Sequence, residues 1–326
     1  AQRSLSLPKG PQGFVKLSQR SLSLPKGPQG FVRLSQRSLI LSKGPRRLGL
    51  GWPERPRRSI TMHELQPRFD KAHEVTLAAG RLALDYFGRF DTLEIQSKGV
   101  QDMASEADLE TEQLIRDELL QAFPNDGFLG EETGRLDLDS TEGLWVVDPI
   151  DGTQPFVNGL TDWCVSIAFV QAGILQFGLV YRPATDELFE GGRWFAATRN
   201  GRPISPSQAT SLSEGLTYLG ASPRVGPDQV VPVLDRLLHA RGLFIRYGSG
   251  ALGLCDVACG RIIGYVEAHI NAWDCLGAVA VLEAAGARVS DYLTPVSLLK
   301  GNSIVAGGPA VFDQLVEVLG TAAQQR

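Results

Sequence analysis

The sequence predicts a layered α/β fold, because segments with strand character alternate with segments of helical character over most of its 326 residues. Short apolar runs such as 144–147 have the length of buried strands, and apolar residues recur at helical spacing in segments such as 69–90. With 43% hydrophobic residues, the chain can bury a large core. We therefore expect strands gathered in sheets, with helices packed against the sheet faces.

The predicted elements follow one another in two halves, over 62–205 and 206–326. The first half is expected to hold helices at 69–90 and 106–123 and strands at 144–147, 163–171, 174–181, 188–190 and 195–198, followed by a turn at Asn200-Gly201. The second half is expected to alternate helices at 228–240, 251–259, 272–285 and 309–319 with strands at 243–247, 264–267 and 303–306.

Residues 1–61 differ from the rest, since they hold thirteen Lys and Arg against one acid, a charge of +12 that leaves −16 for the remainder. The segment 2–15 recurs unchanged at 19–32, and a degraded third copy starts at Gln36. Its Pro, Gly, Ser and Arg content predicts disorder. Three origins stay open: a transit-type targeting segment, a basic arm for nucleic acid or anionic lipid, and translated upstream repeat DNA before a true start at Met62. The near-identity of the copies favours the last.

Three acidic motifs carry the functional signal, and the middle one is Asp-Pro-Ile-Asp-Gly-Thr at 148–153. The apolar run ends at Asp148, and Pro149 is expected to stop the strand. One turn can aim Asp148 and Asp151 at a common point. Gly152 and Thr153 offer backbone N–H groups at an expected helix start, which suits a phosphate. Alone, this motif would fit an acidic turn with a capping Asp equally well.

The other two motifs are Glu131-Glu132 and Trp273-Asp274. Adjacent glutamates are usually a solvated loop, and Asp274 alone fits the N-cap of the apolar helix that follows it. Together, however, the three motifs supply several oxygen ligands of the kind that Mg²⁺ prefers. The sequence therefore predicts a site for a pair of hard divalent cations.

These motifs resemble those of the inositol monophosphatase family, which are magnesium-dependent, lithium-sensitive phosphatases, and the resemblance runs from about residue 69 to 319. It implies a five-layer αβαβα sandwich of the sugar-phosphatase type, a cytoplasmic homodimer and two Mg²⁺ ions, with a third left open. It also implies the metal ligands: Asp148 bridges both metals, Glu131 and the Ile150 carbonyl join the first site with Glu132 in the same pocket, and Asp151 and Asp274 complete the second site.

The resemblance implies a mechanism as well. Asp108 matches the aspartate that hydrogen-bonds the threonine of the Asp-Gly-Thr motif, here Thr153, to activate water near Glu131 and its metal; the alternative for Asp108 is a simple first-turn helix acid. One metal would lower the pKa of a bound water and the other would stabilise the leaving oxygen, without a covalent intermediate. Ala104-Ser105 and Gln154-Pro155 depart from the residues usual in the family.

The substrate is a phosphate ester whose identity the sequence leaves open. Glu267 stands seven residues before Asp274, where the family's glutamate contacts inositol hydroxyls, and the loop around Ser249 is expected to lie near the substrate ring. Alternatively, Glu267 is a surface acid at a strand end. Inositol 1-phosphate is the favoured substrate and histidinol phosphate its strongest rival, before fructose bisphosphate and phosphoadenosine phosphate. A binding protein with a vestigial metal site is the alternative from another class.

Composition excludes several other functions. The acidic body argues against nucleic acid as a substrate, and no apolar run reaches 18 residues, so we expect no membrane span. The histidines show no zinc spacing. We interpret the four cysteines as small buried hydrophobic residues and not as ligands or disulfides: Cys164, Cys255, Cys259 and Cys275.

Overall fold

The computed structural model describes residues 61–89, 95–99, 102–136 and 142–320, and for 95–99, 102–105 and 135–136 it describes the backbone alone. The tail predicted at 1–61 therefore lies, except for Thr61, outside the described residues. In the described part of the chain no helix has both the length and the apolar character needed to cross a membrane.

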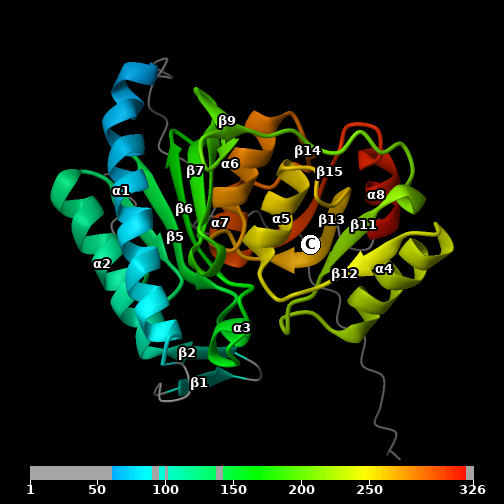
Figure 1. Cartoon of the computed structure of the whole chain (residues 1–326), viewed down its shortest axis with the longest axis horizontal. Helices are drawn as coiled ribbons and strands as arrows, with labels where there is room; N and C mark the ends of the chain where they lie inside the picture. Colours follow the sequence, from blue (N-terminus) through cyan, green and yellow to red (C-terminus); the bar gives the residue numbers. More distant parts are fainter. Residues whose placement is uncertain (1–60, 90–94, 100–101, 137–141, 321–326) are drawn as a thin grey trace, which may run out of the picture. The chain divides into compact units, whose positions relative to one another are not determined.

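Two β-sheets alternate with three sets of helices, which makes five layers (Figure 1). Helices α1 (Met62–Phe87) and α2 (Glu106–Ala122) cover the outer face of the first sheet. Helices α5 (Gly250–Ala258) and α6 (Leu276–Ala285) lie between the sheets, and α4 (Pro227–His239) and α8 (Phe312–Leu319) cover the second sheet. The predicted αβαβα sandwich is thus confirmed.

The first sheet has eight strands, all paired antiparallel except β3 with β5. In spatial order they are β10 (Arg202–Pro203), β9 (Phe195–Arg199), β8 (Glu187–Gly192), β7 (Ile174–Arg182), β6 (Cys164–Gln171), β5 (Leu144–Asp151), β3 (Gly127–Gly130) and β4 (Gly134–Leu136). The predicted turn before β10 is present, with Asn200 and Gly201 both in the left-handed region.

The second sheet has five strands, in which β11 pairs parallel with both of its neighbours. In spatial order they are β12 (Leu243–Ile245), β11 (Leu216–Gly220), β13 (Gly264–Ile270), β15 (Asn302–Gly307) and β14 (Arg288–Val289). The remaining elements are the hairpin β1 (Ile95–Gly99) and β2 (Asp102–Ser105), the short helices α3 (Thr153–Val157) and α7 (Ser297–Lys300), and the 3₁₀ turns η2 (Pro183–Thr185) and η3 (Leu212–Glu214).

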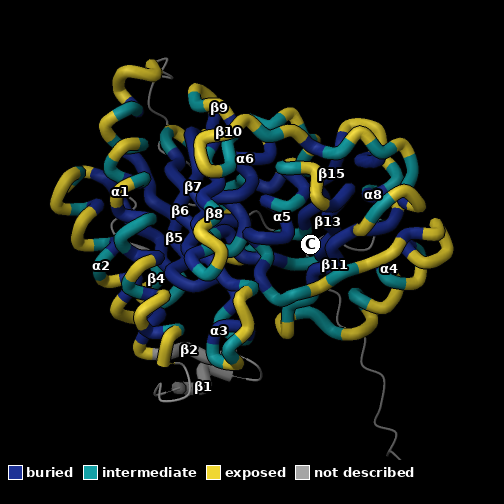
Figure 2. Tube along the Cα trace, viewed as in Figure 1, coloured by how far each residue is buried: buried dark blue, intermediate teal, exposed yellow. Residues whose placement is uncertain are grey.

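Both faces of the first sheet are buried, which explains the uninterrupted apolar runs of its central strands. Side chains alternate across a strand, so Trp145 and Val147 of β5 pack under α1 and α2, whereas Leu144 and Val146 face the middle helices. The rows of buried residues appear as dark blue strands at the centre of Figure 2, with α5 and α6 equally buried beside them. The outer helices alternate between buried and exposed positions, as amphipathic helices do.

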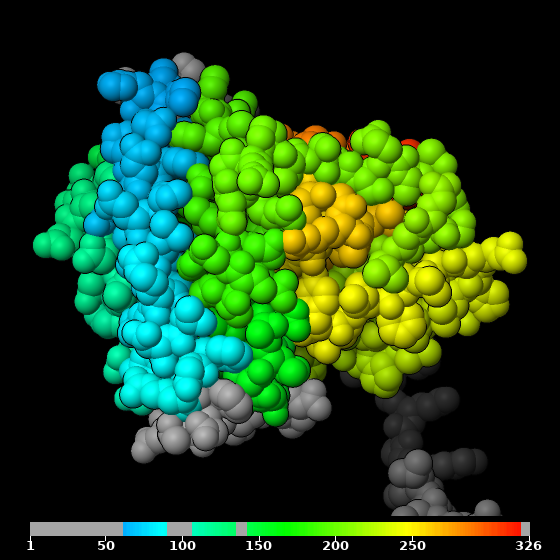
Figure 3. All heavy atoms as spheres, in the orientation of Figure 1, coloured from blue at the N-terminus to red at the C-terminus, as the bar shows by residue number. Residues whose placement is uncertain are grey.

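Helix α1 starts seven residues earlier than predicted, because Pro67 lies inside it instead of before it. Its start is stabilised by Glu64, whose carboxylate accepts a hydrogen bond from the Thr61 backbone N–H at 3.0 Å. In the space-filling view α1 forms one flank of the visible face (blue to cyan in Figure 3), alongside residues of the first sheet. This flank is remote in sequence from the second sheet, whose strands come from 216–307.

One strand prediction was wrong, and several strands were not predicted. Strand β5 does not end at Asp148 but continues through Pro149 to Asp151, because a register shift in its pairing with β6 between Asp148 and Asp151 tolerates a residue without an N–H donor. Strand β11, at the centre of the parallel part of the second sheet, was not predicted at all. Its five residues Leu-Thr-Tyr-Leu-Gly are too short to show a period.

Candidate active site

The register shift in β5 gives its two aspartates, Asp148 and Asp151, different surroundings. Asp148 is 1% exposed and its Oδ1 accepts a hydrogen bond from the Ile150 N–H at 3.0 Å, which turns the chain between the two acids. Gly152 follows with φ of 99°, a left-handed conformation that favours glycine, and a Cβ there would lie 2.7 Å from the Asp162 carbonyl. The Asp-Gly-Thr corner is therefore fixed by the backbone, and the five-residue helix α3 starts at Thr153 as predicted.

Asp148 meets one carboxylate from each of the other motifs. Carboxylate oxygens of Glu131, Asp148 and Asp274 all lie within 4.8 Å of one another, and in the described chain they are the one group of three or more potential metal-ligating side chains. Glu131 follows β3, Asp148 lies in β5 and Asp274 precedes α6. Three segments, of which the last lies more than a hundred residues after the other two, thus bring three acids together.

Asp274 is not the N-cap of α6, since Cys275 occupies that position. Its Oδ2 instead accepts hydrogen bonds from the backbone N–H and the side-chain amide of Asn271, both at 3.2 Å. These bonds fix the carboxylate, which has an oxygen within 4.8 Å of those of Asp148 and Glu131. The capping alternative for this motif is therefore wrong.

Asp151 lies beside this group but is held from another direction. Its Oδ2 accepts the Ser249 hydroxyl at 2.5 Å and the Ala251 N–H at 2.7 Å, and its Oδ1 accepts the Gly250 N–H at 3.3 Å. The carboxylate thus sits on the first turn of α5, where the helix dipole favours negative charge. Ser249, predicted to lie near the substrate, is fully buried and supports Asp151, while its neighbours Gly248 and Gly250 line the pocket.

The predicted pairing of Asp108 with Thr153 is present in the geometry. The Thr153 hydroxyl lies 3.3 Å from Asp108 Oδ1 and 3.2 Å from the Ile150 carbonyl oxygen, so it can donate to either acceptor. Asp108 is fully buried in the first turn of α2, 45 residues from its partner in sequence. The side chains of Ala104 and Ser105 lie outside the described atoms.

One buried acid near the site was not predicted. Glu112, in α2 one turn after Asp108, is fully buried. Its carboxylate accepts the backbone N–H groups of Glu132 and Thr133, each at 2.8 Å. The i, i+4 spacing from Asp108 was the signal that could have found it, since it places both acids on one helix face.

Glu267 also lines the pocket that holds Glu131 and Asp274. It is 6% exposed, and the Tyr265 hydroxyl donates a hydrogen bond to it. Tyr265 in turn stacks on Tyr218, with ring centroids 4.8 Å apart and planes 5° from parallel. The strand-end surface acid that we considered for Glu267 is therefore wrong: the side chain is buried and oriented.

One pocket of about 730 Å³ is lined by Glu131, Asp151, Thr153, Glu267 and Asp274, and the buried Asp148 lies beside two of these acids. Besides the acids, Arg224 and Arg246 lie at its mouth from the loops before α4 and α5. Both side chains are exposed, and within the described residues neither guanidinium forms an ion pair. Arg246 instead donates to the Ala221 carbonyl at 3.0 Å. The pocket thus has an acidic base and two cationic groups at its rim.

Burial raises the pKa of four carboxyls in this region: Asp148, Asp151, Glu267 and Asp274. Burial raises the pKa of Asp148 well above its usual range, helped by the negative charges of Glu131, Asp151 and Asp274. Burial also raises the pKa of Asp151 to about 7 and that of Glu267 to about 8, although hydrogen bonds from Ser249 and Tyr265 oppose these shifts. Protonation relieves this repulsion in the metal-free protein, and nearby cations would instead stabilise the ionised carboxylates.

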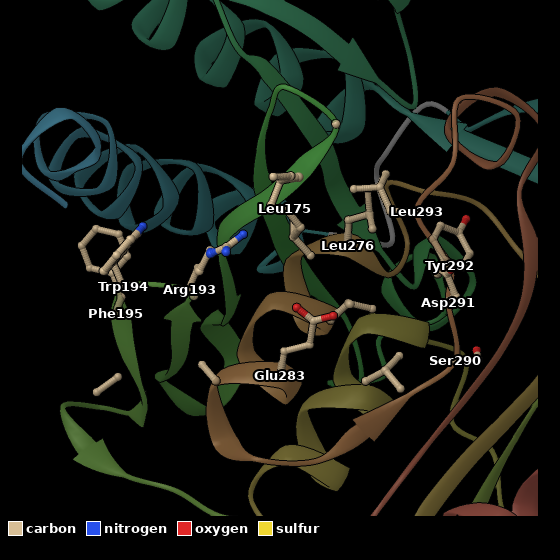
Figure 4. Close-up of a pocket in the computed structure, with 17 residues that line it drawn as sticks. Leu175, Arg193, Trp194, Phe195, Leu276, Glu283, Ser290, Asp291, Tyr292 and Leu293 are labelled. Atoms are coloured by element: carbon tan, nitrogen blue, oxygen red, sulfur yellow. The ribbon is translucent and has the colours of Figure 1, made fainter. Parts of the chain in front are cut away.

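A larger pocket, of about 970 Å³, lies elsewhere, between the β8–β9 hairpin and one side of α6 (Figure 4). Leu175 and Leu276 line it, with Arg193 and Glu283 pointing toward its interior. It contains none of the motif residues. We therefore place the candidate active site in the smaller pocket, where the carboxylates converge.

A sequence model of the inositol monophosphatase family matches residues 64–323 of the chain. The chain belongs to the inositol monophosphatase family. It is 35% identical to an inositol-1-monophosphatase of Synechocystis over 80% of this chain and 91% of the relative. It is 33% identical to a histidinol-phosphatase of Chlorobaculum parvum, over 80% of this chain and all of that protein.

Among solved structures, the extragenic suppressor protein suhB of Bartonella henselae is similar, with a TM-score of 0.73 and 29% identity over 78% of this chain and 99% of that one. The suspected family and the phosphatase class are thus confirmed, whereas relatives with three different names leave the substrate unassigned.

The donor set fits the hard cations that family membership implies. The three acids Glu131, Asp148 and Asp274 offer only oxygen atoms as ligands, and these atoms converge within 4.8 Å. The pKa values of Asp148 and Asp274 are raised, which means that their ionised forms are destabilised without a cation. The cysteines stay out of this set: all four are free, and burial raises the pKa of the Cys164 thiol far above its usual range. The predicted burial holds for Cys164, Cys255 and Cys275, whereas Cys259 is only partly buried.

Proposed function

We propose that the protein hydrolyses the phosphate monoester of a small polyol, and that inositol 1-phosphate is its substrate. The observation that carries this proposal is the shared pocket, into which the acids at its base and Glu267 on its wall both open. Oxygen-ligated Mg²⁺ binds phosphate, and a buried carboxylate accepts hydrogen bonds from hydroxyls. A polyol phosphate presents both groups within one small molecule.

Asp148, Glu131 and the Ile150 carbonyl would hold one Mg²⁺ ion, Asp148, Asp151 and Asp274 a second, and the number of ions beyond two stays open. When bound, these ions would neutralise the phosphate and make water a stronger nucleophile. Glu132 would add negative charge beside the first ion, and the N–H groups of Gly152 and Thr153 would donate to the phosphate.

The chain's own contribution to proton transfer would come from Asp108 and Thr153. While the Thr153 hydroxyl donates to Asp108 Oδ1, its oxygen can accept a hydrogen bond from the attacking water. The water is thereby oriented, and its proton has a path toward a buried carboxylate. Glu267, held by Tyr265, would orient the polyol through its hydroxyls.

Histidinol phosphate is the second candidate, because one relative carries the name histidinol-phosphatase. Histidinol phosphate carries a cationic amino group apart from its phosphate. The guanidinium groups of Arg224 and Arg246 at the pocket mouth would repel such a group, although Glu267 could attract it. The rim charges therefore favour a neutral polyol.

A binding protein of the same fold is the third candidate, since some relatives carry the name Nus factor SuhB in place of a phosphatase name. The complete set of carboxylates in the pocket supports catalysis instead. We further propose a homodimer, as the family resemblance implies, which light scattering of the purified protein would test.

A phosphate-release panel tests the proposal. Inositol 1-phosphate, histidinol phosphate, fructose 1,6-bisphosphate, phosphoadenosine phosphate and phenyl phosphate are compared at equal concentration, with Mg²⁺ and with EDTA. We expect the highest kcat/KM on inositol 1-phosphate, only with Mg²⁺, and inhibition by millimolar lithium. Preference for histidinol phosphate would promote the second candidate, and no release from any substrate would favour the third.

A further inference from the structure

The buried carboxylate of Glu112 has backbone amides as its partners. It is fully inaccessible to solvent, and each of its two oxygens accepts one N–H, from Glu132 and from Thr133, at 2.8 Å. Within the described residues no Lys, Arg or His side chain forms an ion pair with it. A buried charge without a cation is costly unless its hydrogen bonds are well made, and charge-assisted bonds of this length are strong.

These two amides belong to the segment that carries the first acidic motif. The Glu131 N–H itself donates to the Val147 carbonyl at 3.2 Å, which continues the pairing of β3 with β5. Residues 131–133 are therefore held from the sheet on one side and from α2 on the other. The fit to α2 is close, since a Cβ on Gly130 would lie 2.3 Å from Glu112 Oε2.

Helix α2 thus contacts two of the three acidic motifs at positions one turn apart. Asp108 contacts Thr153 of the 148–153 motif, and Glu112 holds the 131–133 segment. Because side chains at i and i+4 lie on one face of a rigid helix, their spacing also sets the spacing of the two motifs. A shift of the 131–133 segment away from α2 would move Glu131 relative to Asp148 and Asp274.

We propose that Glu112 is a positioning residue that fixes Glu131 for metal binding. This role rests on the metal dependence in the proposed function, but not on the identity of the substrate. Glu112 does not line the pocket and is too deeply buried to touch a substrate. It acts through the backbone of 131–133, and it uses both carboxylate oxygens to do so.

Two substitutions separate positioning from charge. Glu112→Gln keeps the shape but replaces one acceptor oxygen by an NH₂ group, which faces an N–H donor. Glu112→Asp keeps the charge, but it is one methylene shorter and cannot reach both amides. Glu118→Gln is the matched control, because Glu118 lies on the same helix with an exposed side chain paired to Lys71 at 2.6 Å.

The test is direct Mn²⁺ binding, measured from the free-ion signal in electron paramagnetic resonance, together with the rise in melting temperature that Mn²⁺ causes. We expect both Glu112 variants to weaken Mn²⁺ binding about ten- to a hundred-fold and to reduce the Mn²⁺-induced stabilisation. The kcat at saturating Mn²⁺ should recover to within a few-fold of wild type. Glu118→Gln should bind Mn²⁺ as wild type does.

Three outcomes overturn the proposal. Wild-type Mn²⁺ affinity in Glu112→Gln, with a melting temperature lowered equally with and without metal, would make Glu112 a purely structural residue. Weak binding in Glu112→Gln but normal binding in Glu112→Asp would leave only a charge effect. A wild-type protein that binds no Mn²⁺ would overturn both this role and the metal site.

If the wild type binds Mn²⁺ but releases no phosphate, only the proposed function fails. Should Glu112→Gln not fold, Glu112→Asp still decides.

Discussion

The two acidic segments of the first sheet are held in opposite ways. Segment 130–133 is anchored through its backbone, by Glu112 and by the edge of β5, which leaves the carboxylate of Glu131 to face Asp148. Segment 148–153 is anchored through its side chains, since the carboxylate of Asp151 accepts three hydrogen bonds from Ser249 and the start of α5.

This difference affects what each acid can offer to a cation. A carboxylate has about four lone-pair positions. Two short bonds use Oδ2 of Asp151, so Oδ1, with one contact of 3.3 Å, is the oxygen that remains for a metal. Asp148 has one backbone bond and lies between the two segments. The centre of the site should therefore be more sensitive to substitution than its anchored edge.

The largest effect is expected from Asp148→Asn. Because Asp148 is shared by both proposed cation positions, its neutralisation should lower kcat at least about a thousand-fold. The fold should survive, since the amide keeps the side-chain volume. Activity at saturating Mg²⁺ is the measurement, and Asp313→Asn at an exposed position is the control. Substantial activity in Asp148→Asn would remove the residue from the centre of the site.

The next effect concerns the wall of the pocket rather than the metal segments. Glu267→Gln should lower kcat/KM for inositol 1-phosphate about ten- to a hundred-fold, because a charge-assisted hydrogen bond to a hydroxyl is lost. Phenyl phosphate has no such hydroxyl, so the kcat/KM for this substrate should fall little. Both substrates are assayed at one Mg²⁺ concentration. Equal losses would mean that Glu267 supports the site structurally.

A smaller effect is expected at the anchor of Asp151. Ser249→Ala removes the hydroxyl that donates to Asp151 and the cap of α5, where the Ser249 oxygen accepts from the Leu252 N–H at 3.2 Å. Helix capping loss should cost about 1 kcal/mol of unfolding free energy, and the Mg²⁺ concentration for half-maximal activity should change several-fold. Ser211→Ala, at the cap of η3, is the control for capping alone. An unchanged Mg²⁺ requirement would show that Asp151 does not depend on this anchor.

The smallest effect is a pH dependence of stability in the metal-free protein. Burial raises the pKa of Asp151 to about 7 and of Glu267 to about 8, above the values of the unfolded chain. The stability that protonation contributes is fully present below the unfolded pKa and is lost as pH rises through the folded pKa. Between pH 5 and 8, the unfolding free energy in EDTA should fall as pH rises. The slope should be about 1.4 kcal/mol per pH unit for each proton that the folded state keeps and the unfolded state has released.

Mg²⁺ should counteract this decline, because it binds the ionised carboxylates. Urea unfolding at several pH values, with EDTA and with Mg²⁺, measures both curves. A stability in EDTA that rises with pH over this range would contradict the raised pKa values. Identical curves with and without Mg²⁺ would contradict the cation site itself.

Most of the fold could be predicted because its strands are buried on both faces and its helices are amphipathic. The sequence missed several short strands, among them β11, whose five residues show no period, and it misplaced the end of β5, because a bulge makes room for Pro149. Likewise, the motif acids could be found from their spacing. Glu112, Ser249 and Tyr265 could not be assigned their roles, since each acts by contacting a residue that only the tertiary structure brings near.

The central claim is that three separated acidic segments form one magnesium-dependent phosphatase site. The most direct measurement is phosphate release from inositol 1-phosphate as Mg²⁺ is titrated into EDTA-treated protein. We expect no release without Mg²⁺ and a saturable rise with it, which Asp148→Asn eliminates. Equal release in EDTA, or a Mg²⁺-dependent rise that persists in Asp148→Asn, would contradict the claim.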